Sequence, residues 1–338
     1  MTVRVLVVGT GFGARVVAPV FSETRGCAVV QVVSARDDEG IASGIARERP
    51  DLVTVHSPPF LHDRHVRIVL DAGVGAVMCD KPFTIGADTS ESLCAAAVDA
   101  GVRHLMNFEF RCDPGRERLR ALVRDGAVGR VERVSWTHWS SASRVPLRRY
   151  GWLFDESRGG GFVNAWGSHA VDTLRWLLDD ELHVATAALT TTIRTRPGDD
   201  GERHQCSADD AFTATLRSTR DVEISLDASF VATASLAPRI LVGGSDGVLE
   251  LIGDARLVRR GADGAREVID AADDAAAPDA AADRHLLPMR RWAERVRDVV
   301  TSGLDASTPL AAVPTFADGV ACDRVLAAIR NHRAWGGG

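Results

Sequence analysis

The first third of the chain alternates between short apolar runs and amphipathic segments. Residues 3–8 (VRVLVV) are largely apolar and β-branched, which is typical of a strand buried in a parallel sheet. Further strands are predicted at residues 27–36, 50–58, 74–80 and 102–110, with helical segments between them. The short link between the second and third strands leaves room for only a stunted helix, at residues 41–48. This alternation predicts right-handed βαβ units and a doubly wound parallel sheet, an α/β fold.

The pattern changes after residue 112. A helix at 115–126, a strand at 130–139 and a helix near 166–178 precede a region, residues 183–269, of alternating strands and turns. An Ala/Asp-rich tract follows, which we expect to be a solvated loop, and two helices near residues 285–301 and 315–332 end the chain. We therefore predict a Rossmann domain at residues 1–112 and an α+β domain with one large, mostly antiparallel sheet at residues 113–338.

Composition narrows the possible partners. The 338 residues are 45% hydrophobic, and the net charge is −6 with scattered arginines, which argues against a nucleic-acid or anionic-membrane partner. No apolar run approaches the roughly 20 residues of a membrane span, and the N-terminus resembles a strand rather than a signal peptide. Six cysteines without a C-x-x-C spacing favour reduced thiols in a cytoplasmic protein. We predict no metal, because no cysteine or carboxylate completes a ligand spacing with His56, His62 and His65.

A glycine motif follows the first strand. Residues 9–14 (GTGFGA) match G-x-G-x-x-A between a strand and a helix. Gly9 would allow the tight turn, Gly11 would let the backbone approach a pyrophosphate, and Ala14 would allow close helix–strand packing. The placement predicts dinucleotide binding, and the alternative is a glycine-rich turn with nothing bound.

The end of the second strand indicates which dinucleotide is preferred. The region reads Ser34-Ala35-Arg36, and the acidic residues Asp37 and Asp38 come only afterwards. Serine and arginine suit the 2′-phosphate of NADP, so NADP is favoured and NAD is possible. In the alternative, Arg36 is solvated and Asp37 holds the ribose of NAD.

Two further strand ends carry polar side chains. Ser57, Pro58 and His62 follow the third strand, and Asp80-Lys81-Pro82 follow the fourth, at the edge where open α/β sheets bind ligands. Lys81 is the only lysine among 40 basic residues. Composition alone leaves open whether it survives by chance or by necessity.

The second domain carries one further candidate motif, "GGGFVNAWGSHAVD" at residues 159–172. It places His169 early in a helix, although a packed core histidine is the common alternative. The G-x-S-x-G pattern at 243–247 joins two predicted strands, so we interpret it as a hairpin turn and not a hydrolase elbow.

Together these motifs resemble the Gfo/Idh/MocA oxidoreductase family, of the glucose–fructose oxidoreductase and inositol dehydrogenase types. The resemblance covers essentially the whole chain and includes S-P-x-x-x-H at 57–62, D-K-P at 80–82, "NFEFR" at 107–111 and the closing helix at 316–329. It implies a Rossmann domain, an open-faced sheet domain, a nicotinamide between them and a homodimer or homotetramer formed through the sheet. It also implies that Lys81 contacts cofactor ribose and substrate hydroxyl, and that His169 exchanges the substrate proton. Family members often carry an aspartate four residues before that histidine, where this chain has Ala165.

The predicted function is an NAD(P)-dependent oxidoreductase acting on a hydroxyl or keto group of a sugar, cyclitol or related polyol. A desolvated lysine can donate or accept the proton, whereas arginine cannot lose its own. The alternatives are redox-neutral elimination, epimerisation or glycoside cleavage through transient oxidation, and a non-enzymatic dinucleotide sensor. The expected catalytic residues are Lys81 and His169, and the expected substrate-binding residues are Lys81, Tyr150, Trp152, Asn164 and His169. The expected cofactor-binding residues are Gly9, Gly11, Phe12, Gly13, Ala14, Ser34, Arg36, Ser57, Pro58, His62, Asp80, Lys81, Pro82 and Arg111.

Overall fold

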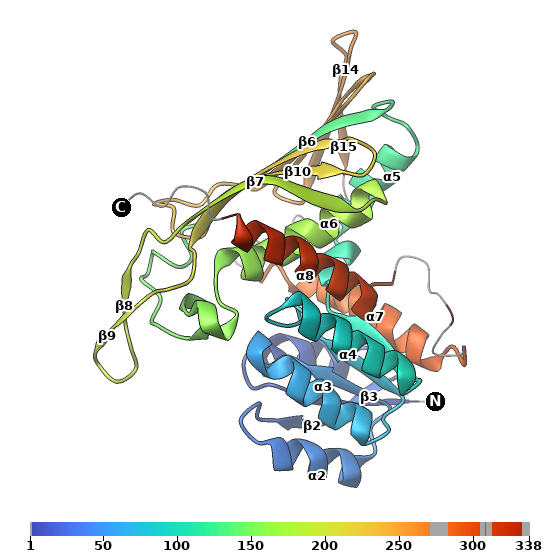
Figure 1. The fold of residues 1–338 in the computed structure, drawn as a ribbon. Coiled ribbons are helices and arrows are strands. Elements are labelled where there is room, and N and C mark those ends of the chain that lie inside the picture. Colours follow the sequence, from blue (N-terminus) through green and yellow to red (C-terminus); the bar gives the residue numbers. More distant parts are fainter. Residues whose placement is uncertain (1, 271–282, 305–307, 309–312, 333–338) are drawn as a thin grey trace. The chain divides into compact units, whose positions relative to one another are not determined.

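The computed structural model describes residues 2–270, 283–304, 308 and 313–332, which fold into two compact units (Figure 1). The first unit comprises residues 1–112 and 281–324, and the second comprises residues 113–280 and 325–338. Residues 281–324, which the predicted division placed in the second domain, therefore belong to the first unit. Most of the Ala/Asp tract, residues 271–282, lies outside the described residues.

The first unit is built on a parallel five-stranded sheet, as predicted from the apolar runs. The strand order is β2-β1-β3-β4-β5, and all neighbouring pairs are parallel. The strands are β1 (Val3–Val8), β2 (Cys27–Val33), β3 (Leu52–Val55), β4 (Ala76–Cys79) and β5 (Arg103–Met106). The last strand ends at Met106, four residues before its predicted end, because residues 109–112 turn into a 3₁₀ helix.

The helices of this unit alternate with its strands. They are α1 (Ala18–Glu23), preceded by a π-helical turn at Gly13–Val17, α2 (Asp38–Glu48), α3 (His62–Asp71), α4 (Ala87–Asp99), α7 (Leu286–Thr301) and the first part of α8 (Phe316–Asn331). The expectation of a stunted helix after β2 was wrong, because α2 has 11 residues. The Asp37 carboxylate accepts a hydrogen bond from the Gly40 N–H at 2.8 Å, and this cap starts the helix three residues earlier than predicted.

α7 closes the core of the first unit. Its residues Met289, Trp292 and Val296 are at most 1% exposed and join the same apolar cluster as the β1 valines and Met78 of β4. The Trp292 indole N–H also donates to the Met78 sulfur at 3.2 Å. The apolar spacing of α7 is visible in the sequence, but the sheet it covers is more than 170 residues earlier.

The second unit contains an eight-stranded sheet in the order β15-β14-β13-β12-β6-β11-β10-β7. Every neighbouring pair is antiparallel except β6–β11, so the prediction of a mostly antiparallel sheet is confirmed. These strands are β6 (Val131–Trp139), β7 (Leu182–Thr190), β10 (Ala211–Ser218), β11 (Glu223–Ser229), β12 (Arg239–Gly244), β13 (Gly247–Ile252), β14 (Arg256–Gly261) and β15 (Arg266–Asp270). A small hairpin of β8 (Thr195–Pro197) and β9 (Arg203–Gln205) was not predicted. The G-x-S-x-G segment is the β12–β13 hairpin turn, as interpreted from the sequence.

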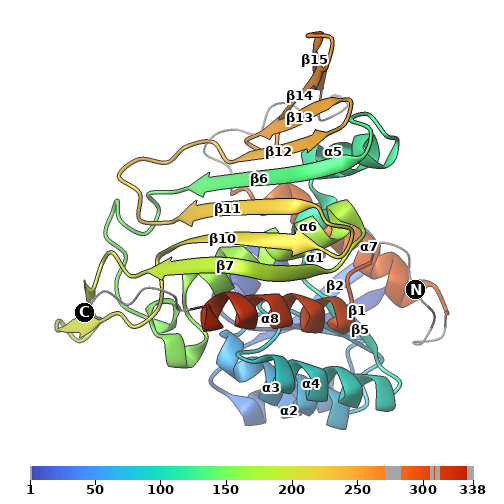
Figure 2. The same ribbon diagram turned by 45° about the horizontal axis from the view of Figure 1, so that its top comes forward.

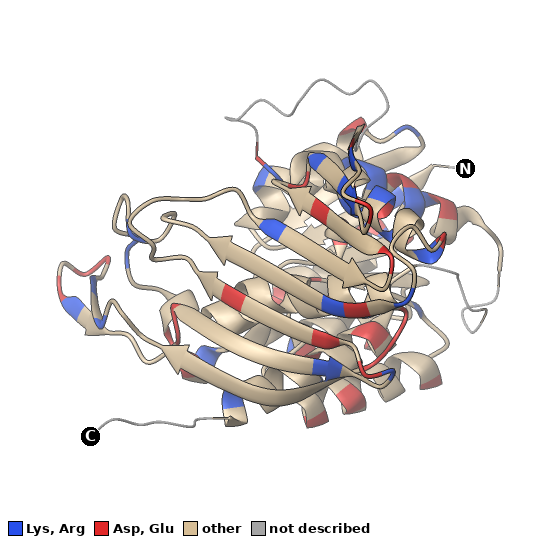
Figure 3. Ribbon diagram, turned by 90° about the horizontal axis from the view of Figure 1, so that it is seen from above, with Lys and Arg blue, Asp and Glu red and all other residues tan. Residues whose placement is uncertain are grey.

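Two helices, α5 (Pro114–Arg124) and α6 (Ser168–Leu178), lie along one face of this sheet (Figure 2). Alternate strand residues such as Trp136, Phe212 and Leu226 are buried on one side, as expected for a sheet with one covered face. Charged residues of both signs are scattered along the strands in Figure 3. No helix among the described residues is long and apolar enough to cross a membrane.

Candidate cofactor and proton-transfer site

The glycine loop after β1 combines two crowded glycines with one open glycine. Gly9 has φ +124°, and a Cβ there would lie 2.6 Å from the backbone oxygen of His56. A Cβ on Gly13 would lie 3.1 Å from Val7 Cγ1, whereas a Cβ on Gly11 would meet no atom within 4 Å. The close approach to the strands that we assigned to Ala14 is therefore made by Gly13. Gly11 leaves open space, which fits the approach of a pyrophosphate to the backbone.

Two candidate ribose-binding side chains, Arg36 and Asp37, follow β2, and they differ in their contacts. The carboxylate of Asp37 is engaged in capping α2. Ser34 Oγ accepts a hydrogen bond from the Arg36 backbone N–H at 3.2 Å. The Arg36 side chain is exposed, and no hydrogen bond or ion pair of its guanidinium occurs within the described part of the chain. The end of β2 thus presents an exposed guanidinium, and the neighbouring carboxylate uses one oxygen, Oδ1, to cap α2.

His62 braces the ends of β3 and β4. Its fully buried ring places Nε2 2.7 Å from the Ser57 carbonyl oxygen and Nδ1 3.0 Å from that of Phe83. Burial lowers the pKa of His62, so the neutral ring is favoured. Both ring nitrogens face backbone carbonyls, and a neutral ring has one N–H, so it donates to one of these carbonyls and packs against the other.

Asp80 gathers three donors at the end of β4. Its carboxylate lies 3.3 Å from His56 Nδ1, and it accepts hydrogen bonds from the Lys81 backbone N–H at 3.0 Å and from Asn107 Nδ2 at 3.3 Å. Burial raises the pKa of Asp80, but the hydrogen bond from His56 and the charges of His56 and Lys81 outweigh burial and hold this pKa at about 2. Asp80 is therefore a fixed anion that orders the strand end carrying Lys81.

Lys81 is partly buried, and its peptide bond to Pro82 is cis. Burial lowers the pKa of Lys81, while the negative charges of Asp80 and Glu109 oppose that shift. A lysine with a lowered pKa reaches its neutral form closer to physiological pH, which is what a proton acceptor requires.

Sequence reasoning missed several polar residues at this edge of the sheet, namely His56, Asn107, Glu109 and His285. Glu109 Oε1 lies 2.7 Å from His285 Nδ1, and the His285 ring contacts Phe12 of the glycine loop with a centroid distance of 5.3 Å. No local motif marks these contacts, because they join residues far apart in the sequence. Arg111, predicted to bind cofactor, is buried in an ion pair with Asp318 at 2.8 Å.

Two of the predicted residues of the second unit, His169 and Asn164, lie in the first turn of α6 and in the turn before it. His169 is in the first turn of α6 and is 5% exposed. The Asn164 amide donates to the Gly159 and Gly160 carbonyls at 3.1 and 3.3 Å, and its oxygen accepts from Arg330. Both ends of the Asn164 side chain are thus used within the fold, whereas the prediction gave it to the substrate. Lys81 and His169 belong to different units, so a shared site for the two stays a prediction.

The buried carboxylate of Asp209 binds the backbone of the segment that leads into α6. Asp209 Oδ2 accepts a hydrogen bond from the Val163 N–H at 2.8 Å, at the start of a π-helical turn, Val163–Gly167, that leads into α6. A Cβ on Gly161 (φ +103°) would lie 2.2 Å from Asp209 Oδ1, so only glycine admits the carboxylate. Burial raises the pKa of Asp209 to about 6, against the hydrogen bonds from Val163 and Phe162 and the charge of Arg330, which lower it.

This raised pKa predicts a pH-dependent contribution of Asp209 to stability. The folded state holds the Asp209 proton more tightly than the unfolded state, so the contribution is present below the unfolded pKa near 4 and is lost as pH rises through about 6. Between pH 7 and pH 5, the wild-type free energy of unfolding should rise relative to Asp209→Asn by about 1 kcal/mol. Urea unfolding of both proteins at the two pH values measures this difference. An equal response to pH in both proteins would contradict it.

The loop that carries Tyr150 and Trp152 contacts the β8–β9 hairpin. Tyr150 stacks on His204 with ring centroids 4.9 Å apart, and Trp152 begins a 3₁₀ turn, Trp152–Phe154. Arg196 of β8 is fully buried and donates to the Ser143 and Arg148 carbonyls at 2.7 and 3.0 Å. The Gly161 N–H donates to the Leu153 carbonyl at 2.8 Å, which holds this loop beside the segment leading to His169.

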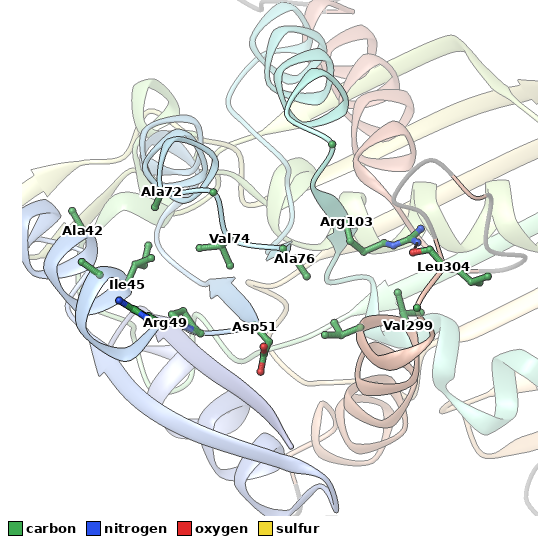
Figure 4. Close-up of a pocket in the computed structure, with 17 residues that line it drawn as sticks. Ala42, Ile45, Arg49, Asp51, Ala72, Val74, Ala76, Arg103, Val299 and Leu304 are labelled. Carbon is green, nitrogen blue, oxygen red and sulfur yellow. Dashed lines mark hydrogen bonds between the residues drawn. The ribbon is translucent and has the colours of Figure 1, made fainter. Parts of the chain in front are cut away.

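A cavity of about 750 Å³ lies elsewhere in the first unit. Figure 4 shows Arg49, Asp51, Ala76, Arg103 and Leu304 among its lining residues. Asp51 precedes β3, whereas Ala76 and Arg103 begin β4 and β5, so this cavity is at the amino ends of the strands. Gly11, Ser57 and Lys81 follow the carboxyl ends, at the opposite edge of the parallel sheet.

The fold thus consists of a Rossmann-type unit and a second unit built on a large sheet. Two family models match the amino-acid sequence of these units. The Gfo/Idh/MocA oxidoreductase family model with an NAD-binding Rossmann fold matches residues 37–108, and the Gfo/Idh/MocA C-terminal domain model matches residues 117–250. Together they cover more than half of the chain. The chain belongs to the Gfo/Idh/MocA family of NAD(P)-dependent oxidoreductases.

Curated relatives and solved structures agree with this membership. An uncharacterised oxidoreductase of Synechocystis sp. is 28% identical over 74% of this chain and 71% of its own length. D-apiose dehydrogenase of Paraburkholderia graminis is 27% identical over 77% of this chain and 70% of its own length. A structure of levoglucosan dehydrogenase in complex with NADH has a TM-score of 0.81 at 18% identity, covering 98% of this chain and 97% of that one, which shows a shared fold.

Proposed function

We propose that the chain is a dehydrogenase acting on a secondary hydroxyl or keto group of a sugar, cyclitol or related polyol. The observation that carries this proposal is the desolvated Lys81 at the carboxyl edge of the sheet that also presents the open glycine Gly11. The relatives named D-apiose dehydrogenase and levoglucosan dehydrogenase support the substrate class. A bound nicotinamide supplies a hydride acceptor in oxidation and a hydride donor in reduction.

Lys81 and His169 handle the proton in this proposal. In oxidation, the neutral Lys81 amine would accept the hydroxyl proton while the carbon that bears this hydroxyl gives a hydride to the nicotinamide. In reduction, the Lys81 ammonium would return the proton to the oxygen. His169, carried by α6, is the second proton-handling group. Tyr150 and Trp152 suit stacking against a sugar face.

A substrate panel tests the activity. Enzyme, NADP⁺ and a series of sugars and cyclitols are mixed, and the absorbance of the reduced nicotinamide is followed. Absorbance should rise with at least one polyol, and the same polyol with NAD⁺ ranks the two cofactors. No rise with any polyol, and no consumption of reduced cofactor with the matching ketones, would overturn the proposal.

We infer a preference for NADP from the residues after β2. Arg36 is exposed, whereas the Asp37 carboxylate uses Oδ1 to cap α2. Arg36→Ala should raise the KM for NADP about tenfold, which corresponds to about 1.4 kcal/mol for a lost charge-assisted contact, and should leave the KM for NAD nearly unchanged. Steady-state kinetics with both cofactors measures the two constants. An unchanged KM for both cofactors would mean that Arg36 is solvated and does not select NADP, and an equal rise in both would mean that it does not contact the 2′-phosphate.

One observation supports a redox-neutral alternative. Ala165 occupies the position at which related proteins often carry an aspartate, and a transiently formed ketone would acidify a neighbouring C–H and allow elimination, epimerisation or glycoside cleavage. Turnover of a sugar or glycoside without net change in added NADP⁺ would favour this alternative.

The sheet of the second unit is the proposed contact between copies of the chain. The proposal rests on one sheet face that lacks α5 and α6, and we expect a homodimer or homotetramer. Light scattering on the purified protein measures the mass, and a monomer at micromolar concentration would contradict the expectation. The cytoplasmic location remains a prediction.

A further inference from the structure

Glu109 is a buried carboxylate that the proposed chemistry does not yet use. It lies in the 3₁₀ turn after β5 and is 1% exposed. Oε1 is paired with His285, whereas Oε2 is buried with no hydrogen-bond partner among the described residues. A buried, half-satisfied carboxylate is costly, so its presence at this edge of the sheet calls for a reason.

The position of Glu109 is fixed from two sides. Two residues before it, the Asn107 N–H donates to the Cys79 carbonyl at 2.7 Å, and the Asn107 side chain donates to Asp80. On the other side, the His285 ring lies 5.1 Å from the Phe110 ring and 5.3 Å from that of Phe12. The carboxylate is therefore anchored between the end of β4 and the glycine loop, with little freedom to move.

Lys81 and Glu109 belong to strand ends joined through Asp80, whose carboxylate accepts hydrogen bonds from the Lys81 backbone N–H and from the side chain of Asn107, two residues before Glu109. Asp80, Glu109 and Cys322 of α8 all raise the pKa of Lys81 against its burial. Asp80 is already engaged with His56, Asn107 and the Lys81 backbone. Glu109, in contrast, keeps Oε2 without a hydrogen-bond partner among the described residues.

We propose that Glu109 is a positioning residue for Lys81, and that His285 holds its carboxylate at the carboxyl edge of the sheet for that task. The inference rests on the proposed proton-transfer role of Lys81. In the family pattern, an aspartate near the histidine assists the proton transfer. In this chain that position is Ala165, and Glu109 supplies a carboxylate from the unit that carries the lysine.

Because Lys81 is the only lysine, its titration can be followed directly and without a substrate. Reductive ¹³C-methylation labels Lys81 and the terminal amine, and the signal missing from Lys81→Arg identifies Lys81 in the NMR spectrum. Glu109→Gln should lower the pKa of this amine by about one unit, since a nearby negative charge is removed. The low-pH limb of the oxidation rate should shift to lower pH by the same amount.

Matched variants separate charge from structure. Glu48 pairs with Arg4 at the opposite edge of the sheet, so Glu48→Gln should leave the Lys81 titration unchanged. His285→Ala removes the contact that holds the Glu109 carboxylate in place, and it should therefore reproduce most of the Glu109→Gln shift. His285→Asn keeps an N–H near the position of Nδ1 and should restore most of the wild-type titration.

The outcomes distinguish this inference from the proposed function. An unshifted Lys81 titration in both Glu109→Gln and His285→Ala would overturn the role of Glu109, even if Lys81→Arg lacks activity. Near-normal turnover in Lys81→Arg would overturn the proposed function, whatever the titration shows. A shift in Glu48→Gln equal to that in Glu109→Gln would mean that the effect is not specific to Glu109.

Discussion

Lys81→Arg should lose turnover by at least about a thousandfold while binding NADP nearly as tightly as the wild type. Arginine keeps its proton, with a pKa above about 12, and therefore cannot accept the hydroxyl proton. Its planar fork is also larger than an ammonium and does not fit a point contact with one hydroxyl. General acid–base groups typically contribute about 10²–10⁴ in rate. The measurements are kcat by reduced-nicotinamide absorbance and Kd for NADP by fluorescence quenching.

The control for this variant is a substitution that removes the positive charge of Lys81. Lys81→Met removes the cation altogether, and it should be as inactive as Lys81→Arg if proton transfer is the essential role. If Lys81→Arg retained near-normal kcat and only Lys81→Met were inactive, a positive charge alone would be required. In that case the proton-transfer role of Lys81 would be wrong.

Gly11→Ala should weaken NADP binding by about a hundredfold without lowering the melting temperature. A Cβ at this position meets no protein atom within 4 Å, so the fold has room for it. The new methyl group instead occupies the space that the pyrophosphate needs for its approach to the backbone. A loss of about 2.7 kcal/mol in binding free energy corresponds to this factor. Calorimetric titration with NADP and thermal unfolding of the free protein measure the two quantities.

Alanine substitutions of two other glycines serve as controls for Gly11→Ala. Gly75→Ala, at the opposite edge of the sheet, has its nearest atom at 3.9 Å and should change neither binding nor stability. Gly9→Ala should lose stability as well as binding, because its Cβ would lie 2.6 Å from the His56 oxygen at a positive φ. Unchanged NADP affinity in a folded Gly11→Ala protein would show that the loop does not bind the dinucleotide.

The sequence predicted the elements whose signals are local. The β-branched apolar runs gave all five parallel strands, and the alternating pattern of residues 183–269 gave most of the large sheet. The hairpin of β8 and β9 was missed because its strands are three residues long and largely polar. The extra length of α2 depends on one side-chain cap, Asp37, which a periodicity pattern does not register.

The candidate site was predictable only in part, for a related reason. Gly11 and Lys81 stand in recognisable motifs at strand ends, so their positions follow from the strands themselves. Glu109 and His285 are 176 residues apart, and neither is in a pattern that indicates the other. Likewise, nothing local to Asn164 shows that Arg330 occupies its oxygen. Long-range contacts decided which polar residues are available to a ligand.

The return of α7 to the first unit has a consequence for biosynthesis. Met289, Trp292 and Val296 complete the core beneath β1, so the cofactor-binding unit cannot bury that face until the ribosome has reached the last sixth of the chain. In the second unit, β6 lies between β11 and β12, which are made about 90 to 110 residues later. Both units thus depend on contacts of high sequence separation, which slow folding. During synthesis the first sheet therefore has an uncovered apolar face and the second sheet lacks strands, and a released fragment ending at Cys112 should be bound by chaperones.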